Sequence, residues 1–167
     1  MKKRFYGKYR GIVSDNSDKM FLGRVKAKVP DVFGTKESGW AYPCAPFGGD
    51  GAGMFVVPKK GAGVWIEFEQ GNPEKPIWSG VWWGATPQVP TDVFTPVPWK
   101  KLMIKTEGGT TFILDDTPIT GGITLKTASG QVLKMTATGI ELTFSPKSTI
   151  KLGPKGVSVN DGALEVI

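Results

Sequence analysis

The side chains that most often carry acid–base and metal chemistry are scarce in this chain. It contains no histidine and a single cysteine, Cys44. Without histidine the commonest general base is missing, and Ser–His or Cys–His nucleophiles cannot form. Zinc sites need several cysteines or histidines. We therefore expect no catalytic residue, no cofactor and no bound metal, and we interpret Cys44 as a small buried residue.

Two carboxylate pairs and one glycine-rich segment remain as candidates. Glu67 and Glu69 are two residues apart, so they would share one face of a strand. The two carboxylates of a glycosidase must lie close together, and this spacing would allow it. We interpret them as a solvent-facing strand edge. The adjacent Asp115 and Asp116 are more typical of a turn than of a calcium site. Residues 48–53 lack the lysine and the strand–loop–helix context of a phosphate loop, so we expect a flexible loop.

The elements that must position these residues are β-strands. We find no window with helical apolar spacing, and glycine (23) and proline (13) are frequent. From residue 122 onward, apolar residues recur at every second position in short pieces that restart every seven to ten residues. Period two predicts strands with one buried face. The fold class is therefore all-β, with a C-terminal β-helix or prism-like stack.

The chain divides into three segments by composition. Residues 1–84 predict a small Greek-key barrel of the OB-fold type, with a core and rim of aromatic residues. Residues 85–100 hold four prolines and predict an extended, fairly stiff linker. Residues 101–167 form the strand array, the shaft. The strands expected in the barrel are 4–14, 21–29, 40–46, 54–57, 64–69 and 76–82, and its aromatic residues are Trp40, Tyr42, Trp65, Phe68, Trp78, Trp82 and Trp83.

A single copy of the array would have little core of its own. Strands this short bury about two side chains each and leave unpaired edges. Three copies winding around one axis would close these edges and share a continuous core, so we expect a homotrimer; a single-chain solenoid against another protein would also work. The expected trimer core comprises Ile104, Phe112, Leu114, Ile123, Leu125, Leu133, Met135, Ile140, Leu142, Ile150, Leu152, Val157 and Val159.

The net charge and the N-terminal segment indicate which partners and which cell compartment to consider. The net charge is +6, and most of the excess lies in residues 1–84. Basic and aromatic residues on an OB-fold are typical of single-stranded nucleic-acid binding, which is the alternative function, but the array has no role in it. A carbohydrate-binding fibre is a third interpretation. No run of 18 apolar residues and no apolar segment after the basic N-terminus is present, so we expect neither a spanning helix nor a signal peptide.

The sequence from Gly61 to Gly84, GAGVWIEFEQGNPEKPIWSGVWWG, resembles a motif of phage baseplate assembly protein V and of VgrG-type spikes. The segments GRVKAKVP from Gly23, EGGTTFILDDTP from Glu107 and VNDGALEV from Val159 resemble further parts of that family in the same order. The residues that match the family motif in the OB domain are Gly61, Val64, Phe68, Glu69, Gly71, Pro73, Pro76 and Gly80.

This resemblance implies the structural, non-enzymatic central spike of a contractile tail or phage-like injection particle, assembled in the bacterial cytoplasm. An OB-fold collar would attach to a hub protein, here expected to be a separate chain, and the shaft would pierce the outer membrane of the target cell. No lysozyme domain is expected between collar and shaft. A PAAR-type protein would cap the tip, and nucleic acid is not an expected partner. The residues expected to dock the cap are Leu164, Glu165, Val166 and Ile167.

Overall fold

The computed structural model describes residues 3–94 and 98–166, which form two compact units, Met1–Val89 and Pro90–Ile167. The all-β prediction is confirmed: within the described residues the only α-helix is the four-residue α1, Pro30–Phe33, beside short 3-10 helices. No helix of the described chain is long and apolar enough to cross a membrane. Each unit is built around its own sheet.

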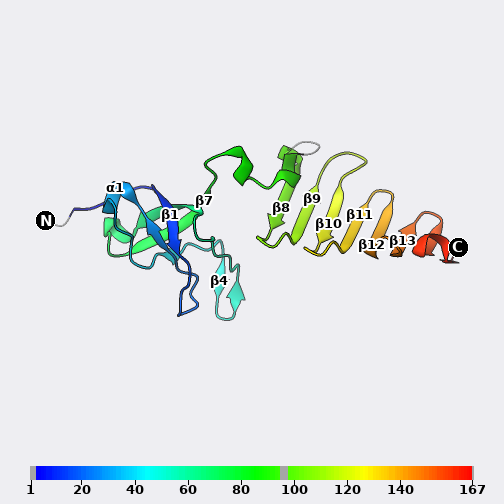
Figure 1. Ribbon diagram of the computed structural model, residues 1–167, viewed down its shortest axis with the longest axis horizontal. Helices are drawn as coiled ribbons and strands as arrows, with labels where there is room; N and C mark the ends of the chain where they lie inside the picture. The colour runs from blue at the N-terminus through cyan, green and yellow to red at the C-terminus, as the bar shows by residue number, and fades with distance from the viewer. Residues whose placement is uncertain (1–2, 95–97, 167) are drawn as a thin grey trace. The chain divides into compact units, whose positions relative to one another are not determined.

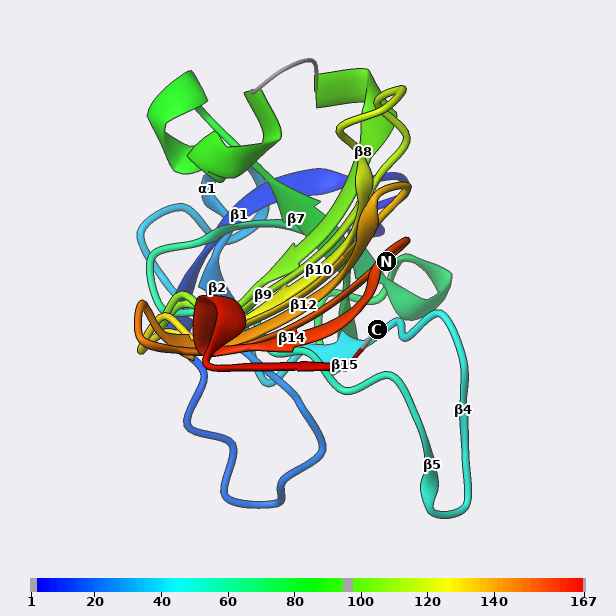
Figure 2. The same cartoon turned by 90° about the vertical axis from the view of Figure 1, so that its right-hand side faces the viewer.

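The first unit is a curved five-stranded sheet in the order β2-β1-β6-β7-β3 (Figure 1). All its neighbours are antiparallel except the parallel pair β3 and β7. A separate two-stranded hairpin, β4 and β5, projects away from this sheet (Figures 1 and 2). The bounds are β1 Tyr9–Asp15, β2 Lys26–Lys28, β3 Tyr42–Pro43, β4 Gly48–Gly49, β5 Ala52–Gly53, β6 Gly63–Phe68 and β7 Pro76–Trp82.

Aliphatic side chains dominate the core of the first unit. Because strand residues alternate between faces, β6 buries Val64, Ile66 and Phe68 and turns Trp65 to the other face. Of the aromatic residues expected in the core and rim, Phe68 and Trp78 are buried. The core consists of Val13, Val25, Ala27, Val29, Ala41, Val64, Ile66, Phe68 and Trp78.

Several local expectations for this unit were wrong. The expected strand 54–57 is absent, and the strands of the hairpin are glycine-rich pieces within 48–53, where no apolar alternation exists to reveal them. Cys44 is exposed rather than buried, because it lies where the chain leaves β3 toward the hairpin. By contrast, β7 has the bounds predicted for it.

The proline-rich linker is not uniformly extended. It contains three 3-10 helices, η2 Thr86–Gln88, η3 Thr91–Phe94 and η4 Pro98–Lys100. Proline fixes φ near the value that a first helical turn needs, so it opens such turns as readily as it stiffens extended chain. Residues 95–97, which include Pro96 of the expected linker, lie outside the described residues.

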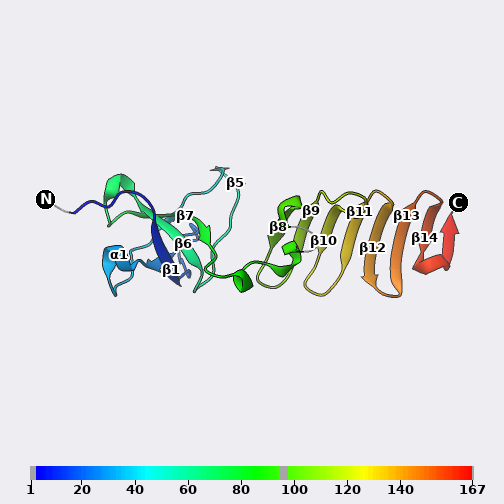
Figure 3. The same cartoon turned by 90° about the horizontal axis from the view of Figure 1, so that it is seen from above.

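The second unit is one eight-stranded antiparallel meander, in which every strand pairs with its neighbours in the chain (Figures 1 and 3). Figure 2 looks along this stack, and successive strands turn gradually relative to one another. The bounds are β8 Lys101–Lys105, β9 Thr111–Asp115, β10 Gly122–Lys126, β11 Val132–Thr136, β12 Gly139–Ser145, β13 Ser148–Gly153, β14 Gly156–Val159 and β15 Leu164–Val166.

The strands of the meander pair with one another within a single chain. We expected other copies to close the edges of the short strands. Instead, the chain itself pairs all strands from β9 to β14 on both sides, and only β8 and β15 are edge strands. The backbone of the shaft is therefore satisfied within one chain, and what one copy lacks is cover for a face of its sheet.

Candidate functional site

The register of the meander aligns apolar residues in two continuous rows. Residues that lie directly opposite in an antiparallel pair share one face of the sheet. We call the face that carries both rows the apolar face. One row contains Leu102, Leu114, Ile123, Met135, Ile140, Leu152 and Val157, and the other contains Ile104, Phe112, Leu125, Leu133, Leu142, Ile150, Val159 and Leu164.

Nothing within the described chain covers this face. Among its residues Ile104 is 52%, Leu142 49% and Leu125 44% exposed, and no member of either row is buried. A contiguous apolar surface of this kind on a water-soluble sheet marks an interaction site, because leaving it in water costs free energy. The apolar face is thus the candidate functional site of the molecule.

All thirteen residues expected in the trimer core lie on the apolar face, since the period-two pattern and the pairing register agree. Leu102 was missed, although it lies opposite Leu114. Leu164, which we expect to dock the cap, lies opposite Val159 and extends that row. The backbone of Val166 pairs with Val157, and the backbone of Glu165 with Ser158. Ile167 lies outside the described residues.

The opposite face of the same sheet is mainly polar, although β8 and β9 place Met103 and Ile113 on it. Its middle positions in successive strands from β10 to β14 are Thr124, Lys134, Glu141, Lys151 and Ser158. Lys151 also forms an ion pair with Asp161, which raises the pKa of the lysine. The sheet therefore has one face suited to water and one suited to an apolar partner.

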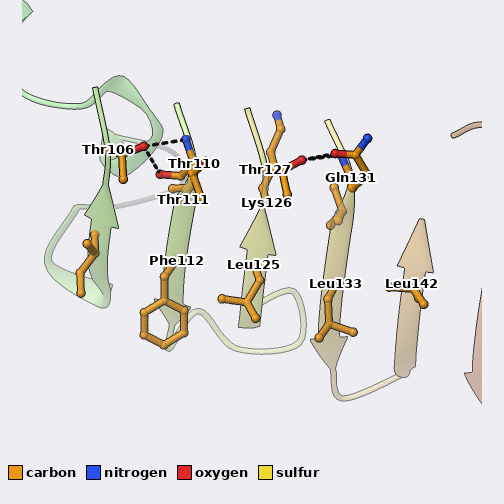
Figure 4. A pocket seen from close by; sticks show the side chains of 12 residues that line it. Thr106, Thr110, Thr111, Phe112, Leu125, Lys126, Thr127, Gln131, Leu133 and Leu142 are labelled. Carbon is orange, nitrogen blue, oxygen red and sulfur yellow. Dashed lines mark hydrogen bonds between the residues drawn. The ribbon is translucent and has the colours of Figure 1, made fainter. Parts of the chain in front are cut away.

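A groove opens on the apolar face near the strand ends that the β8–β9 and β10–β11 connections join (Figure 4). Its floor is made by Ile104, Phe112, Leu125, Leu133 and Leu142 from five successive strands. The floor is apolar and open, so it can accept an apolar side chain from outside.

Two turns of similar construction flank this groove. The amide of Thr110 donates to Thr106 Oγ1 at 3.0 Å, and the amide of Gln131 donates to Thr127 Oγ1 at 3.1 Å. Both bonds link residues four apart across a connection, β8 to β9 in the first case and β10 to β11 in the second (Figure 4). The walls of the groove are therefore held by side-chain bonds.

The carboxylates do not assemble into a catalytic pair. Glu67 accepts hydrogen bonds from Lys8 and from Ser79, which lower its pKa, whereas Glu69 pairs with Lys75 at 3.2 Å. A general acid needs a raised pKa, so Glu67 is unsuited to that role.

Asp115 is the last residue of β9, and its side chain binds the start of the turn that follows. Its Oδ1 accepts from the amide of Thr117 at 2.9 Å and from the Thr117 hydroxyl at 2.6 Å, and these bonds lower its pKa. Lys101 lies 3.7 Å from its other oxygen. Within the described residues, no three Cys, Asp or Glu side chains are grouped so that they could hold a metal ion.

Several aromatic rings of the first unit lie beside the unit's own cations. The guanidinium of Arg10 lies 5.7 Å from the ring of Trp65 and 5.1 Å from that of Trp82. Arg24 lies over Trp40 and Tyr42 in the same way. Single-stranded nucleic acid needs free ring faces for stacking. Trp40 is engaged in this way, whereas Tyr6 and Phe21 are exposed.

The residues of the family motif act in folding. Gly61, Gly71 and Gly80 have φ of +86°, +73° and +146°. Residues other than glycine rarely adopt these backbone angles. Val64 and Phe68 are in the core. At Gly71, a Cβ would also lie only 3.0 Å from the ring of Tyr6. The other members, Glu69, Pro73 and Pro76, lie in or beside the turn between β6 and β7.

Two family models match the chain. Residues 9–83 match the type VI secretion system/phage-baseplate injector OB domain, and residues 101–165 match the phage baseplate V C-terminal trimerisation domain. The first match spans nearly all of β1 to β7, and the second contains the whole apolar face. A comparison with curated proteins finds no match.

Proposed function

The chain belongs to the phage baseplate V and VgrG-type family, and from this premise we propose that it is the central spike of a contractile tail or related injection system, which pierces the envelope of a target cell. Its role in the baseplate is structural. The trimerisation domain in residues 101–165 makes the protein a homotrimer. The proposal concerns what this trimer does and through which residues it forms.

The observation that carries the proposal is the uncovered apolar face. Three copies could turn these faces toward a common axis, so that each sheet forms one side of a three-sided prism. The thirteen residues expected from the sequence, together with Leu102 and Leu164, would then form the axial core. Burying an aliphatic side chain contributes roughly 1.5–3 kcal/mol, and three-fold symmetry repeats every contribution three times.

A prism of this kind suits mechanical work. Its backbone hydrogen bonds are satisfied within each chain and its apolar rows would be shared among three chains, so no single strand could leave without exposing core. The polar face, with Thr124, Lys134 and Lys151, would keep the rod soluble. Sheath contraction would push the rod forward, and a rod that resists unfolding transmits that force.

The remaining partners rest on family membership. We propose that residues 1–84 form a collar that attaches to a hub protein, that 85–100 link it to the shaft, and that a PAAR-type protein docks on Leu164, Glu165, Val166 and Ile167. Contact with the target outer membrane would be transient, and the site of action would be the tail baseplate or a phage-like particle. No catalytic activity is proposed, because the carboxylates described above are engaged in ion pairs and turns.

The first test is the mass of the full chain by light scattering, repeated after exposure to unheated SDS. Three chains of 18.0 kDa give about 54 kDa, and we expect this species to survive the detergent because the core would be shared. A trimer that dissociates at once in SDS would argue against the shared axial core. A monomer would overturn the spike.

A further inference from the structure

The turn between β9 and β10 presents a strained residue. Ile119 has φ of +72°, and the amide of Thr120 donates to Pro118 O at 2.8 Å, which is the hydrogen bond of a γ-turn around Ile119. A γ-turn with positive φ is rare, and a β-branched residue in it is unfavourable. Glycine or asparagine would adopt this φ more easily.

The same residue is also unusually exposed. The side chain of Ile119 is 83% exposed, although it is large and apolar. The turn is held by bonds that do not depend on this side chain: Gly121 N donates to Thr117 O at 2.8 Å, and Asp115 binds Thr117. Within its own chain Ile119 borders an open hollow that is also lined by residues of β11 to β13, such as Thr136 and Ile140, yet it remains largely exposed. Strained residues often mark functional positions, so we looked for the surface that this side chain could meet.

The symmetry of a trimer defines that surface. In a meander, successive connections alternate between the two ends of the strands. We call these two rows of connections the connection edges, as distinct from the edge strands β8 and β15. The β9–β10 connection therefore lies on the connection edge opposite to the β8–β9 and β10–β11 connections. A cyclic trimer uses heterologous contacts, in which one patch meets a different patch of the next copy. In a three-sided prism, the edge that carries Ile119 would therefore meet the other edge of the next sheet.

That other edge carries the groove at the matching level. Its walls are the β8–β9 and β10–β11 turns, which are the direct neighbours of the β9–β10 connection along the stack. A three-fold axis keeps all copies at the same level, so the exposed apolar side chain of Ile119 and the open apolar groove would lie near each other. The groove is also continuous with the apolar face of the trimerisation domain.

We propose that Ile119 of each copy inserts into the groove of a second copy, between the Thr106–Thr110 and Thr127–Gln131 turns, and so clasps adjacent sheets at the corner of the prism. This contact rests on the proposed trimeric shaft and adds to it a specific lock. The strain at Ile119 is then offset in the assembly, where the exposed side chain becomes buried.

Disulfide trapping in the full chain tests the contact. The variant Ile119→Cys with Gln131→Cys is made in a Cys44→Ser background, because the exposed Cys44 could otherwise cross-link. After mild oxidation we expect a ladder ending in covalent trimers on a non-reducing denaturing gel. Each single-cysteine variant should remain monomeric on that gel.

In a matched control, the second cysteine is placed at Lys147 instead of Gln131. Lys147 lies on the same connection edge but further along the stack. Lys147 lies in the β12–β13 turn, three strand spacings, or roughly 14 Å, along the stack from the β9–β10 connection. A disulfide needs Cα atoms within about 7 Å, so Ile119→Cys with Lys147→Cys should not form linked trimers. Equal cross-linking of both pairs, or linkage of neither pair in a chain that light scattering shows to be trimeric, overturns the clasp alone. A monomeric full chain overturns both the clasp and the spike.

A second variant separates the clasp from local strain. Ile119→Asn relieves the unfavourable φ, so a purely local effect would raise the melting temperature. If the side chain is buried in the next copy, the same variant lowers the melting temperature of the trimer and accelerates its dissociation in denaturant. Ile119→Leu, which keeps an apolar side chain, should retain most of the trimer's resistance. A melting temperature that rises for Ile119→Asn contradicts the proposal.

Discussion

At the scale of single residues, Asp18 organises the loop between β1 and β2. Its carboxylate binds the guanidinium of Arg24 at 2.7 and 3.1 Å and accepts from the amides of Met20 and Leu22, each at 3.0 Å. Both charged side chains are largely buried. Arg24 in turn lies over the ring of Tyr42. One carboxylate therefore holds both the loop and the position of a cation on the aromatic surface.

Asp18→Asn should destabilise the first unit at neutral pH and flatten its dependence on acid. The bond from Arg24, followed by the backbone amides, lowers the pKa of Asp18 far below its usual range. The stabilisation is therefore present above the ordinary carboxyl pKa of about 4 and is lost as the pH falls below it. Melting temperatures from pH 7 to pH 2.5, followed by near-ultraviolet circular dichroism, measure this effect. Asp50→Asn, at an exposed position of the hairpin, is the control and should resemble the parent.

Gly139 shows how a glycine limits the shaft. It has φ of +155°, and a Cβ there would overlap the carbonyl oxygen of Leu152 on the neighbouring strand. Gly139→Ala should therefore lower the free energy of unfolding by more than about 1 kcal/mol. Gly108→Ala is a matched control, because a Cβ at Gly108 meets no atom within 4 Å, and its change should stay within about 0.5 kcal/mol. Denaturant titration compares the two, and equal losses would contradict this explanation.

At the scale of elements, two neighbouring residues of strand β10 lie on opposite faces of the sheet, one on the apolar face and one on the polar face. Leu125 lies on the apolar face, between Phe112 and Leu133, and Thr124 lies on the polar face beside Lys134. A charge at the first position would be placed three times around the proposed axis, whereas a charge at the second would remain in water. The two positions share the same strand and the same backbone pairing.

Leu125→Asp should abolish the trimer, and Thr124→Asp should leave it intact. The first change removes roughly 1.5–3 kcal/mol of burial per chain and adds three like charges that would have to be desolvated together. Light scattering at several protein concentrations measures both variants. If Leu125→Asp remains trimeric, the apolar face is not the assembly surface, and a trimer lost equally in Thr124→Asp would point to a defect of the strand itself.

At the scale of the whole molecule, each unit has its own means of stability. The core of the first unit, from Val13 to Trp78, lies entirely within Met1–Val89. Both apolar rows lie within Pro90–Ile167. Folding of the first unit and assembly through the second should therefore be separable.

A chain limited to residues 1–89 should fold but remain monomeric, because it keeps the core and lacks both apolar rows. Residues 90–167 alone should form trimers, because the rows remain. Near-ultraviolet circular dichroism reports the folding of the first piece, and light scattering reports the mass of each. A trimer formed by residues 1–89 would move the main assembly surface to the first unit.

Much of this architecture follows from local patterns. Strand β6 was predicted within one residue and β7 was predicted in full, because turn residues bound both strands. The shaft strands and thirteen of the fifteen residues of the apolar face follow from the same period of two. The hairpin within 48–53 was missed, since glycine carries no alternation signal. Helix α1 was missed because four residues show no helical period.

The sequence by itself determined that the protein is all-β, that it has an OB-type unit and a strand array, and which side chains share one face of each strand, since alternation is a property of the backbone. Only the tertiary structure decided which strands pair. Their pairing within one chain closes nearly every edge and leaves a face uncovered. It also showed that Ile119 is exposed in a connection at one end of the strands while a groove opens near the other end, because both features depend on register and turn geometry.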